Sequence, residues 1–186
     1  MRQTVRLGRV AGIPVGVHWS VLVVLVLLAQ GLAAAVLPAA VPGRPGWQYW
    51  VVAAGTTVLF VASLLAHELA HALAALRCGV RVERVTLWLL GGVAELSGQP
   101  ARPRQELGIA AVGPLTSLAA GGVFFAATVM SAGRLPELAV VAVAWLAWIN
   151  LVLALFNLLP AAPLDGGRVL RALLWQRWSD PVRAHL

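Results

Sequence analysis

The stretch WQYWVVAAGTTVLFVASLLAHELAHALAAL, from Trp47 to Leu76, decides the fold. Its first twenty residues, Trp47–Ala66, carry no charge. A helix needs about 20 apolar residues to cross the hydrocarbon core of a membrane. Three polar residues follow inside the same apolar run: His67, Glu68 and His71. Because ionisable side chains are costly to place within a membrane span, their presence indicates a functional site in the membrane.

Composition extends the membrane interpretation to the whole chain. Hydrophobic residues make up 60% of the sequence and charged residues 11%, and the mean hydropathy is +0.85. Long apolar segments predict four transmembrane helices, at about residues 15–38, 47–77, 106–132 and 137–161. Alternating apolar residues around Gly91-Gly92 predict a β-hairpin at about 79–99, and an Arg-rich stretch predicts an amphipathic cytoplasmic helix at about 166–178. The predicted fold class is an all-α polytopic membrane protein with a small membrane-associated β-hairpin between the second and third helices.

The distribution of charge predicts the orientation of the chain. The net charge is +7, and all 14 basic residues are arginines. Twelve of them lie near the N-terminus, in the 77–104 loop or after residue 167, and only Arg44 and Arg134 lie in the other two loops. The positive-inside rule then predicts a multi-pass protein of the plasma membrane with both termini in the cytoplasm. No single folded basic face is evident, so a nucleic-acid partner is not expected.

The first apolar segment leaves an alternative open. An Arg-rich start, an apolar run and small residues near Ala33–Ala40 also match a secretory signal peptide. The polar and aromatic residues His18 and Trp19 at the entry favour a retained helix. The topology predicted for the later segments is the same in either case.

The sequence His67-Glu-Leu-Ala-His71 matches a metal-binding motif. On a helix this spacing places two imidazoles one turn apart on the same face, where both can bind one Zn²⁺. Glu68 is then placed to accept a proton from a water molecule that the metal activates. The alternative is a pair of core histidines bonded to neighbours, which must also explain three polar groups in one apolar helix. The pattern favours a zinc hydrolase with His67 and His71 as ligands and Glu68 as general base.

A catalytic zinc needs a third protein ligand, and Asp165 is the remaining carboxylate in an apolar context. The second and fourth helices run in the same direction, so helix rise places Asp165 at a depth similar to that of His67. Pro160, Pro163 and the glycines after Asp165 break the helix there. Asn157, just before the break, could bond a free carbonyl, a substrate backbone or an oxyanion. The alternative role for Asp165 is an N-cap of the helix that follows.

These motifs resemble those of the site-2 protease family of intramembrane zinc metalloproteases. The resemblance covers nearly the whole chain: the entry segment Gly12–Ser20, the motif His67–His71, the step Gly113-Pro114 and the second signature Asn157–Gly167. It implies one zinc per chain, held by His67, His71 and Asp165. It also implies Glu68 as the catalytic base of a zinc metalloendopeptidase and Asn157 as a substrate-binding residue. The implied partners are the lipid bilayer and a transmembrane-helix substrate, such as a membrane-held regulator released by regulated intramembrane proteolysis.

Two further points bear on function. Relatives with this entry segment often carry C-terminal CBS domains, whereas this chain ends at Leu186, so the sequence predicts none here and indicates a shortened chain. The alternative function is a membrane metal-binding or metal-transport protein without proteolytic activity. Transporters tend to be built from repeated halves, and no internal repeat is evident in this sequence. The sequence leaves the oligomeric state open.

Overall fold

The computed structural model describes residues 5–88, 91–131 and 133–178. Within them, four helical stretches are long and apolar enough to cross a membrane: Val21–Ala40, Gly46–Arg77, Pro103–Ser131 and Glu137–Asn157. The first stretch combines α1 (Val21–Gly31), the π-helical η1 (Leu32–Val36) and α2 (Leu37–Ala40), and the other three are α3, α4 and α5. The prediction of four transmembrane helices is therefore confirmed.

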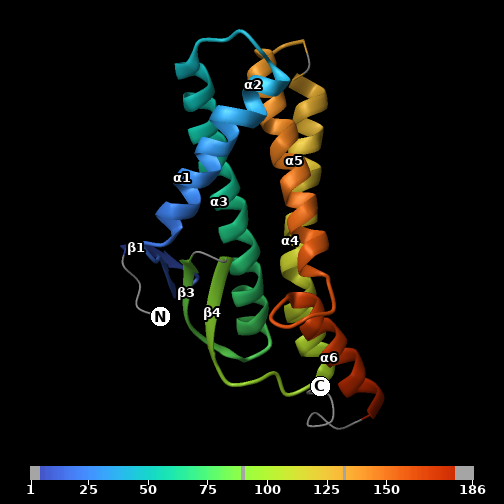
Figure 1. Ribbon diagram of the computed structural model, residues 1–186. Helices are drawn as coiled ribbons and strands as arrows, with labels where there is room; N and C mark the ends of the chain where they lie inside the picture. Colours follow the sequence, from blue (N-terminus) through green and yellow to red (C-terminus); the bar gives the residue numbers. More distant parts are fainter. Residues whose placement is uncertain (1–4, 89–90, 132, 179–186) are drawn as a thin grey trace.

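The helices run alternately up and down between two ends of the molecule (Figure 1). One end, which we call the sheet end, holds a four-stranded sheet and the short helix α6 (Asp165–Trp178), beside the C-terminal half of α3. The other end, which we call the far end, holds α2 and the connection from α4 to α5. Large apolar side chains such as Leu22, Val26 and Phe125 are more than 60% exposed, which suits helices surrounded by lipid.

The sheet contains β1 (Val5–Val10), β2 (Ile13–Val17), β3 (Arg81–Trp88) and β4 (Gly91–Ser97), in that spatial order. β1 and β2 form an antiparallel hairpin, and so do β3 and β4, as predicted for the second pair. The two hairpins join through parallel pairing of β2 with β3, in which Val15 lies opposite Val85. β4 therefore forms one edge of the sheet. It lies beside α3, the helix that carries His67, Glu68 and His71 (Figure 1).

The N-terminal segment differs from the prediction. A transmembrane helix was expected to begin at about residue 15, but Ile13–Val17 form β2 and the helix begins at Val21. Ile13 and Val15 are each only 2% exposed, because they pack at the foot of α3 and against β3. An apolar run of this length fits either a strand or a helix start, and the pairing partner in β3 lies far along the chain.

The end of α3 turns the chain directly into the sheet. Gly79 adopts φ +79°, and its N–H donates to the carbonyl of Leu76 while that of Val80 donates to Ala75. This is a Schellman ending, which favours glycine because a left-handed backbone is strained for other residues. Val80 then packs with Ala72, Ala75 and the inner residues of β3. The sheet is thus fixed against the last turns of the helix that carries His67 and His71.

Two apolar clusters hold the helices together. At the far end, residues of α1–α2, α3 and α5 pack around Leu37, which is fully buried. At the sheet end, α3, the sheet and Ile109 of α4 form the second cluster. Pro103 opens α4, where a missing N–H removes no helical bond, and the Gln105 side chain accepts from the Ala101 N–H. The second cluster includes Ala72, which follows His71 in the chain, and Ile109 of α4.

Candidate metal centre

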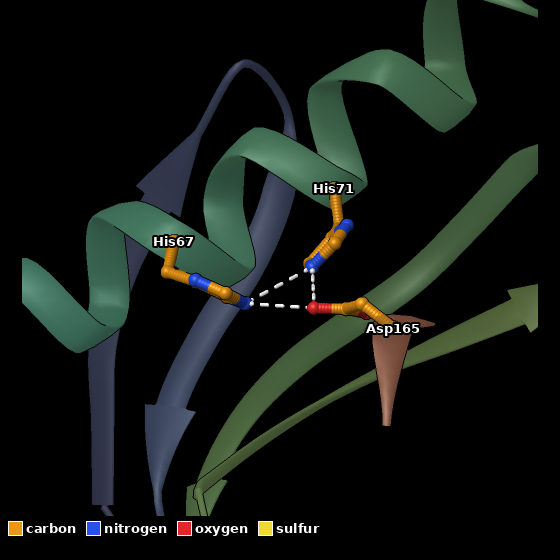
Figure 2. Close-up of side chains that lie close together, drawn as sticks. All are labelled: His67, His71 and Asp165. Atoms are coloured by element: carbon orange, nitrogen blue, oxygen red, sulfur yellow. Dashed lines mark hydrogen bonds and ion pairs between the residues drawn. The ribbon is translucent and has the colours of Figure 1, made fainter. Parts of the chain in front are cut away.

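The start of α6 meets the C-terminal half of α3 and brings three side chains that can bind a metal together (Figure 2). Oδ2 of Asp165 lies 3.1 Å from Nε2 of His67 and 3.1 Å from Nε2 of His71. The two Nε2 atoms are 3.1 Å apart. Both histidines are buried, and Asp165 is 9% exposed. The fold therefore brings together the three residues that the sequence predicts as ligands.

The donor set fits zinc. Two imidazole nitrogens and one carboxylate oxygen are a ligand combination found at catalytic zinc sites that leave a fourth position open. Bonds of about 2.0 Å from a tetrahedral zinc place neighbouring ligand atoms about 3.3 Å apart. The three spacings of 3.1 Å are close to that value without any rearrangement of the backbone. Within the described residues, these are the three His, Cys, Asp or Glu side chains grouped closely enough to share an ion.

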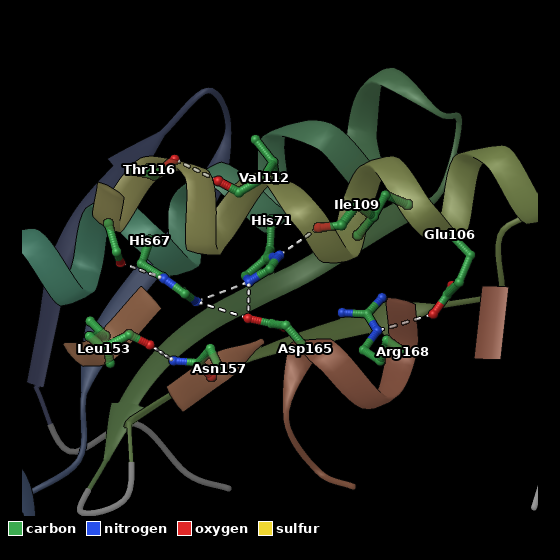
Figure 3. A network of polar contacts seen from close by, with 11 residues as sticks. His67, His71, Glu106, Ile109, Val112, Thr116, Leu153, Asn157, Asp165 and Arg168 are labelled. Atoms are coloured by element: carbon green, nitrogen blue, oxygen red, sulfur yellow. Dashed lines mark hydrogen bonds and ion pairs between the residues drawn. The ribbon is translucent and has the colours of Figure 1, made fainter. Parts of the chain in front are cut away.

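Helix α4 orients both histidines (Figure 3). Nδ1 of His71 lies 2.6 Å from the carbonyl oxygen of Ile109, and Nδ1 of His67 lies 2.9 Å from Oγ of Ser117. A carbonyl oxygen only accepts, so Nδ1 of His71 carries the proton. In the neutral imidazole Nε2 then has the free lone pair that a metal requires. Ser117 can support the same tautomer at His67. Contacts of this kind fix the ring orientation of metal-binding histidines.

Asp165 reaches the histidines because the chain is broken after α5. α5 ends at Asn157, and a segment containing Pro160 and Pro163 leads to Asp165, the first residue of α6. Burial alone would raise the pKa of the Asp165 carboxyl, but hydrogen bonding with His67 and His71 outweighs it and lowers the pKa to about 2. Asp165 is therefore anionic at neutral pH, as a carboxylate that binds a metal must be, and its Oδ2 faces the imidazoles.

All five residues that the sequence predicts for the site line one cavity of about 400 Å³. Glu68 lies in its wall, where the backbone of Gly92 in β4 hydrogen-bonds the carboxylate. A Cβ at position 92 would overlap the Glu68 side chain, with the nearest oxygen at 2.8 Å. Gly92 thus lets β4 approach the predicted base closely enough for its backbone to hold it. Asn157 lines the same cavity, while its amide N–H donates to Leu153 at 2.9 Å (Figure 3).

A second glycine makes room for the two histidines themselves. Gly113 of α4 faces both histidines, and a Cβ there would lie 2.6 Å from Nε2 of His67 and closer still to Nε2 of His71. The absence of a side chain allows α4 to pack directly over the two imidazoles. Pro114 follows and, like Gly113, is buried.

The sequence gives no role in the site to the residues that support it, although Gly113 belongs to the Gly113-Pro114 step of the resemblance. Ser117 and Gly113 are small residues in an apolar helix, a pattern that is ordinary in membrane proteins. The acceptor on Ile109 is a backbone carbonyl, which leaves no trace in the sequence. The spacing gives a further signal: Ile109, Gly113 and Ser117 recur every four residues and so lie on one face of α4.

Comparisons with known proteins find a family model that matches most of the chain and relatives that match nearly all of it. The family model described as Peptidase family M50 matches residues 55–141 and 133–185. Rip3 of Mycobacterium tuberculosis is 54% identical over 185 residues, which is 99% of this chain and 47% of that protein. The zinc metalloprotease MJ0392 of Methanocaldococcus jannaschii is 31% identical over 185 residues, 96% of this chain and 48% of that protein. The chain thus spans about half the length of these relatives.

A solved structure shares the fold. The site-2 protease from Methanocaldococcus jannaschii matches with a TM-score of 0.63 and 31% sequence identity, over 94% of this chain and 73% of that one. The residues that the family model matches include the α3 motif, α4 and the Asp165 signature. The chain therefore belongs to Peptidase family M50, the site-2 protease family.

Proposed function

We propose that this chain is the metal-binding core of an intramembrane zinc metalloendopeptidase. It would hydrolyse peptide bonds in or near transmembrane segments of membrane-held regulators. The observation that carries this proposal is the convergence of His67 and His71 with Asp165, nearly a hundred residues later, in a cavity that also contains Glu68. A metal-binding scaffold needs the three ligands, but it does not need a carboxylate beside them.

His67, His71 and Asp165 would hold one zinc ion per chain. Bound zinc would supply Lewis-acid activation of the scissile carbonyl and of a water molecule. Glu68 accepts the proton of the attacking water and returns it to the leaving nitrogen. The Gly92 backbone holds the Glu68 carboxylate in place for both transfers, and the contacts from α4 keep Nε2 of each histidine directed at the metal.

The substrate would bind as an extended strand along β4. A peptide bond within a helix is shielded, so the substrate must unwind before it can be cut. β4 is the edge of the sheet, and Gly91, Gly92 and Ala94 line the same cavity as the ligands. Pairing with an exposed edge aligns an extended peptide through backbone hydrogen bonds. Asn157 is the last residue of α5 and lines the same cavity, so it would contact the substrate or the developing oxyanion.

The proposed orientation places both termini and the sheet end in the cytoplasm and the far end outside, in the plasma membrane. Cys78 is the single cysteine of the chain, so a Cys78→Ala background allows labelling of introduced cysteines. We expect a membrane-impermeant maleimide to label Arg134→Cys in intact cells, and Arg102→Cys only after the membrane is opened. The reverse pattern would contradict the orientation. Both positions are exposed, so accessibility is not limited by the fold.

Two substitutions test the proposed chemistry. Glu68→Gln keeps the shape of the side chain but removes its proton-accepting ability, so we expect it to retain zinc and to lose cleavage of a membrane-helix substrate. His67→Ala is expected to lose zinc as well. Glu137→Gln is the matched control, because Glu137 is exposed at the far end and should retain both properties. Undiminished cleavage by Glu68→Gln would contradict the assignment of the base. Zinc flux through proteoliposomes without cleavage would favour a transport protein.

A further inference from the structure

Glu106 is a buried carboxylate that the proposed chemistry does not use. It lies in the first turn of α4 and is 1% exposed. Its Oε1 accepts hydrogen bonds from Nη2 of Arg171 at 2.6 Å and from Nε of Arg168 at 3.1 Å. Within the described residues Oε2 has no hydrogen-bond partner. A buried charge is costly unless it is paired, so Glu106 depends on these two arginines.

Both arginines belong to the helix that begins with the predicted third ligand. Asp165 is the first residue of α6, Arg168 lies one turn further on, and Arg171 lies one more turn beyond. The bonds to Glu106 therefore tie the first two turns of α6 to α4. Figure 3 shows Arg168 reaching from α6 to Glu106, with Asp165 at the start of the same helix. Among the described residues, the polar partners of the Asp165 side chain are the two histidines of α3 and not a residue of α4.

Glu106 also shares its helix with the groups that orient the histidines. Ile109, which accepts from His71, lies three residues after Glu106, and Ser117, which contacts His67, lies two turns beyond that. Helix α4 thus supports all three proposed ligands. It contacts the two histidines directly, and it supports Asp165 through the arginines of α6.

We infer that Glu106 is a positioning residue for the metal centre: by pairing with Arg168 and Arg171 it fixes α6 on α4 and so holds Asp165 opposite His67 and His71. This inference rests on the proposed function, because it takes these three residues as the zinc ligands. Without the carboxylate, the two arginines lose the acidic partner that they have among the described residues. The start of α6 is then no longer fixed on α4, and Asp165 is no longer held opposite the two histidines.

The test is zinc affinity in purified, detergent-solubilised protein, measured by competition with a chelator of known affinity. We expect Glu106→Gln to weaken zinc binding about 10-fold, the lower end of the range for groups that support metal ligands. Arg171→Gln, at a side chain that is 29% exposed, should weaken it in the same direction and remains informative if Glu106→Gln does not fold. Because both changes break the same link, the double variant should bind zinc no more weakly than Glu106→Gln alone.

Two controls separate positioning from general stability. Glu137→Gln makes the same chemical change at an exposed site and should bind zinc as the parent does. Leu37→Ala removes a fully buried side chain at the far end, so it should lower the melting temperature without changing zinc affinity. Parent-like zinc affinity in Glu106→Gln or in Arg171→Gln, whatever the melting temperature, would overturn the inference. Failure of the parent itself to bind zinc would instead refute the proposed function.

Discussion

Gly113 offers the sharpest test of how closely α4 packs over the proposed metal ligands. In Gly113→Ala the new Cβ would lie 2.6 Å from Nε2 of His67 and closer still to Nε2 of His71. Ordinary contacts of a Cβ begin at 3.4 Å, so relief of the contact with His67 alone requires a movement of about 0.8 Å, and relief of the contact with His71 requires more. A functional constellation tolerates displacements of only about 0.5 Å. The displacement that the substitution requires therefore exceeds the displacement that such a site tolerates.

The expected effect on zinc follows from that displacement. We expect Gly113→Ala to weaken zinc binding by about 10- to 100-fold, as loss of ligand support does elsewhere. Overpacking of a dense interior costs about 1–3 kcal/mol, so the melting temperature should fall as well. The gain in helix propensity from glycine to alanine, about 1 kcal/mol, offsets only part of this cost.

The matched control is Gly122→Ala in the same helix. A Cβ at position 122 would meet nothing within 4 Å, so this variant gains helix propensity without a clash. It should bind zinc as the parent does and melt at the same or a higher temperature. Zinc affinity is measured by chelator competition and stability by thermal unfolding in the same detergent. If Gly113→Ala binds zinc as tightly as Gly122→Ala, the described packing of α4 over the histidines is wrong.

Three further substitutions address other contacts of the site. Ser117→Ala removes the partner of His67 Nδ1 and should weaken zinc binding about 10-fold in chelator competition. Zinc affinity equal to that of the parent would contradict this role for Ser117. Gly92→Ala displaces Glu68 but no ligand, so we expect kcat to fall about 100-fold while zinc content is unchanged; loss of zinc would show that β4 supports the ligands instead. Asn157→Ala should raise KM for a membrane-helix substrate without loss of zinc, and an unchanged KM would remove Asn157 from substrate binding.

Much of the fold could be predicted from hydropathy alone. Each apolar segment is long enough to span a membrane, and that length fixes a helix whatever its neighbours are. The first hairpin could not be predicted in this way. Val15 and Val17 continue into an apolar run, so hydropathy assigns them to the helix, whereas the structure pairs them with β1 and with Val85 and Leu87 of β3, some 70 residues away. Pairing across such a distance leaves no local pattern in the sequence.

The site, like the fold, has parts that a local sequence pattern predicts and parts that depend on distant contacts. The spacing of His67 and His71 is a local property of one helix, and Asp165 could be placed by its depth in the membrane. The supports of these residues depend on which face α4 presents to α3 and α6. Glu106 illustrates the difference: in the sequence it is an acidic residue near a helix start, and only the fold brings Arg168 and Arg171 to it.

The most direct test of the central claim is the zinc content of the Asp165→Ala variant beside that of the parent. Asp165 is the ligand that only the folded chain can bring to the histidines of α3. Metal analysis of the purified proteins should find one zinc per chain in the parent and little or none in the variant. If Asp165→Ala retains one zinc with the affinity of the parent, the three residues do not form the metal centre described above.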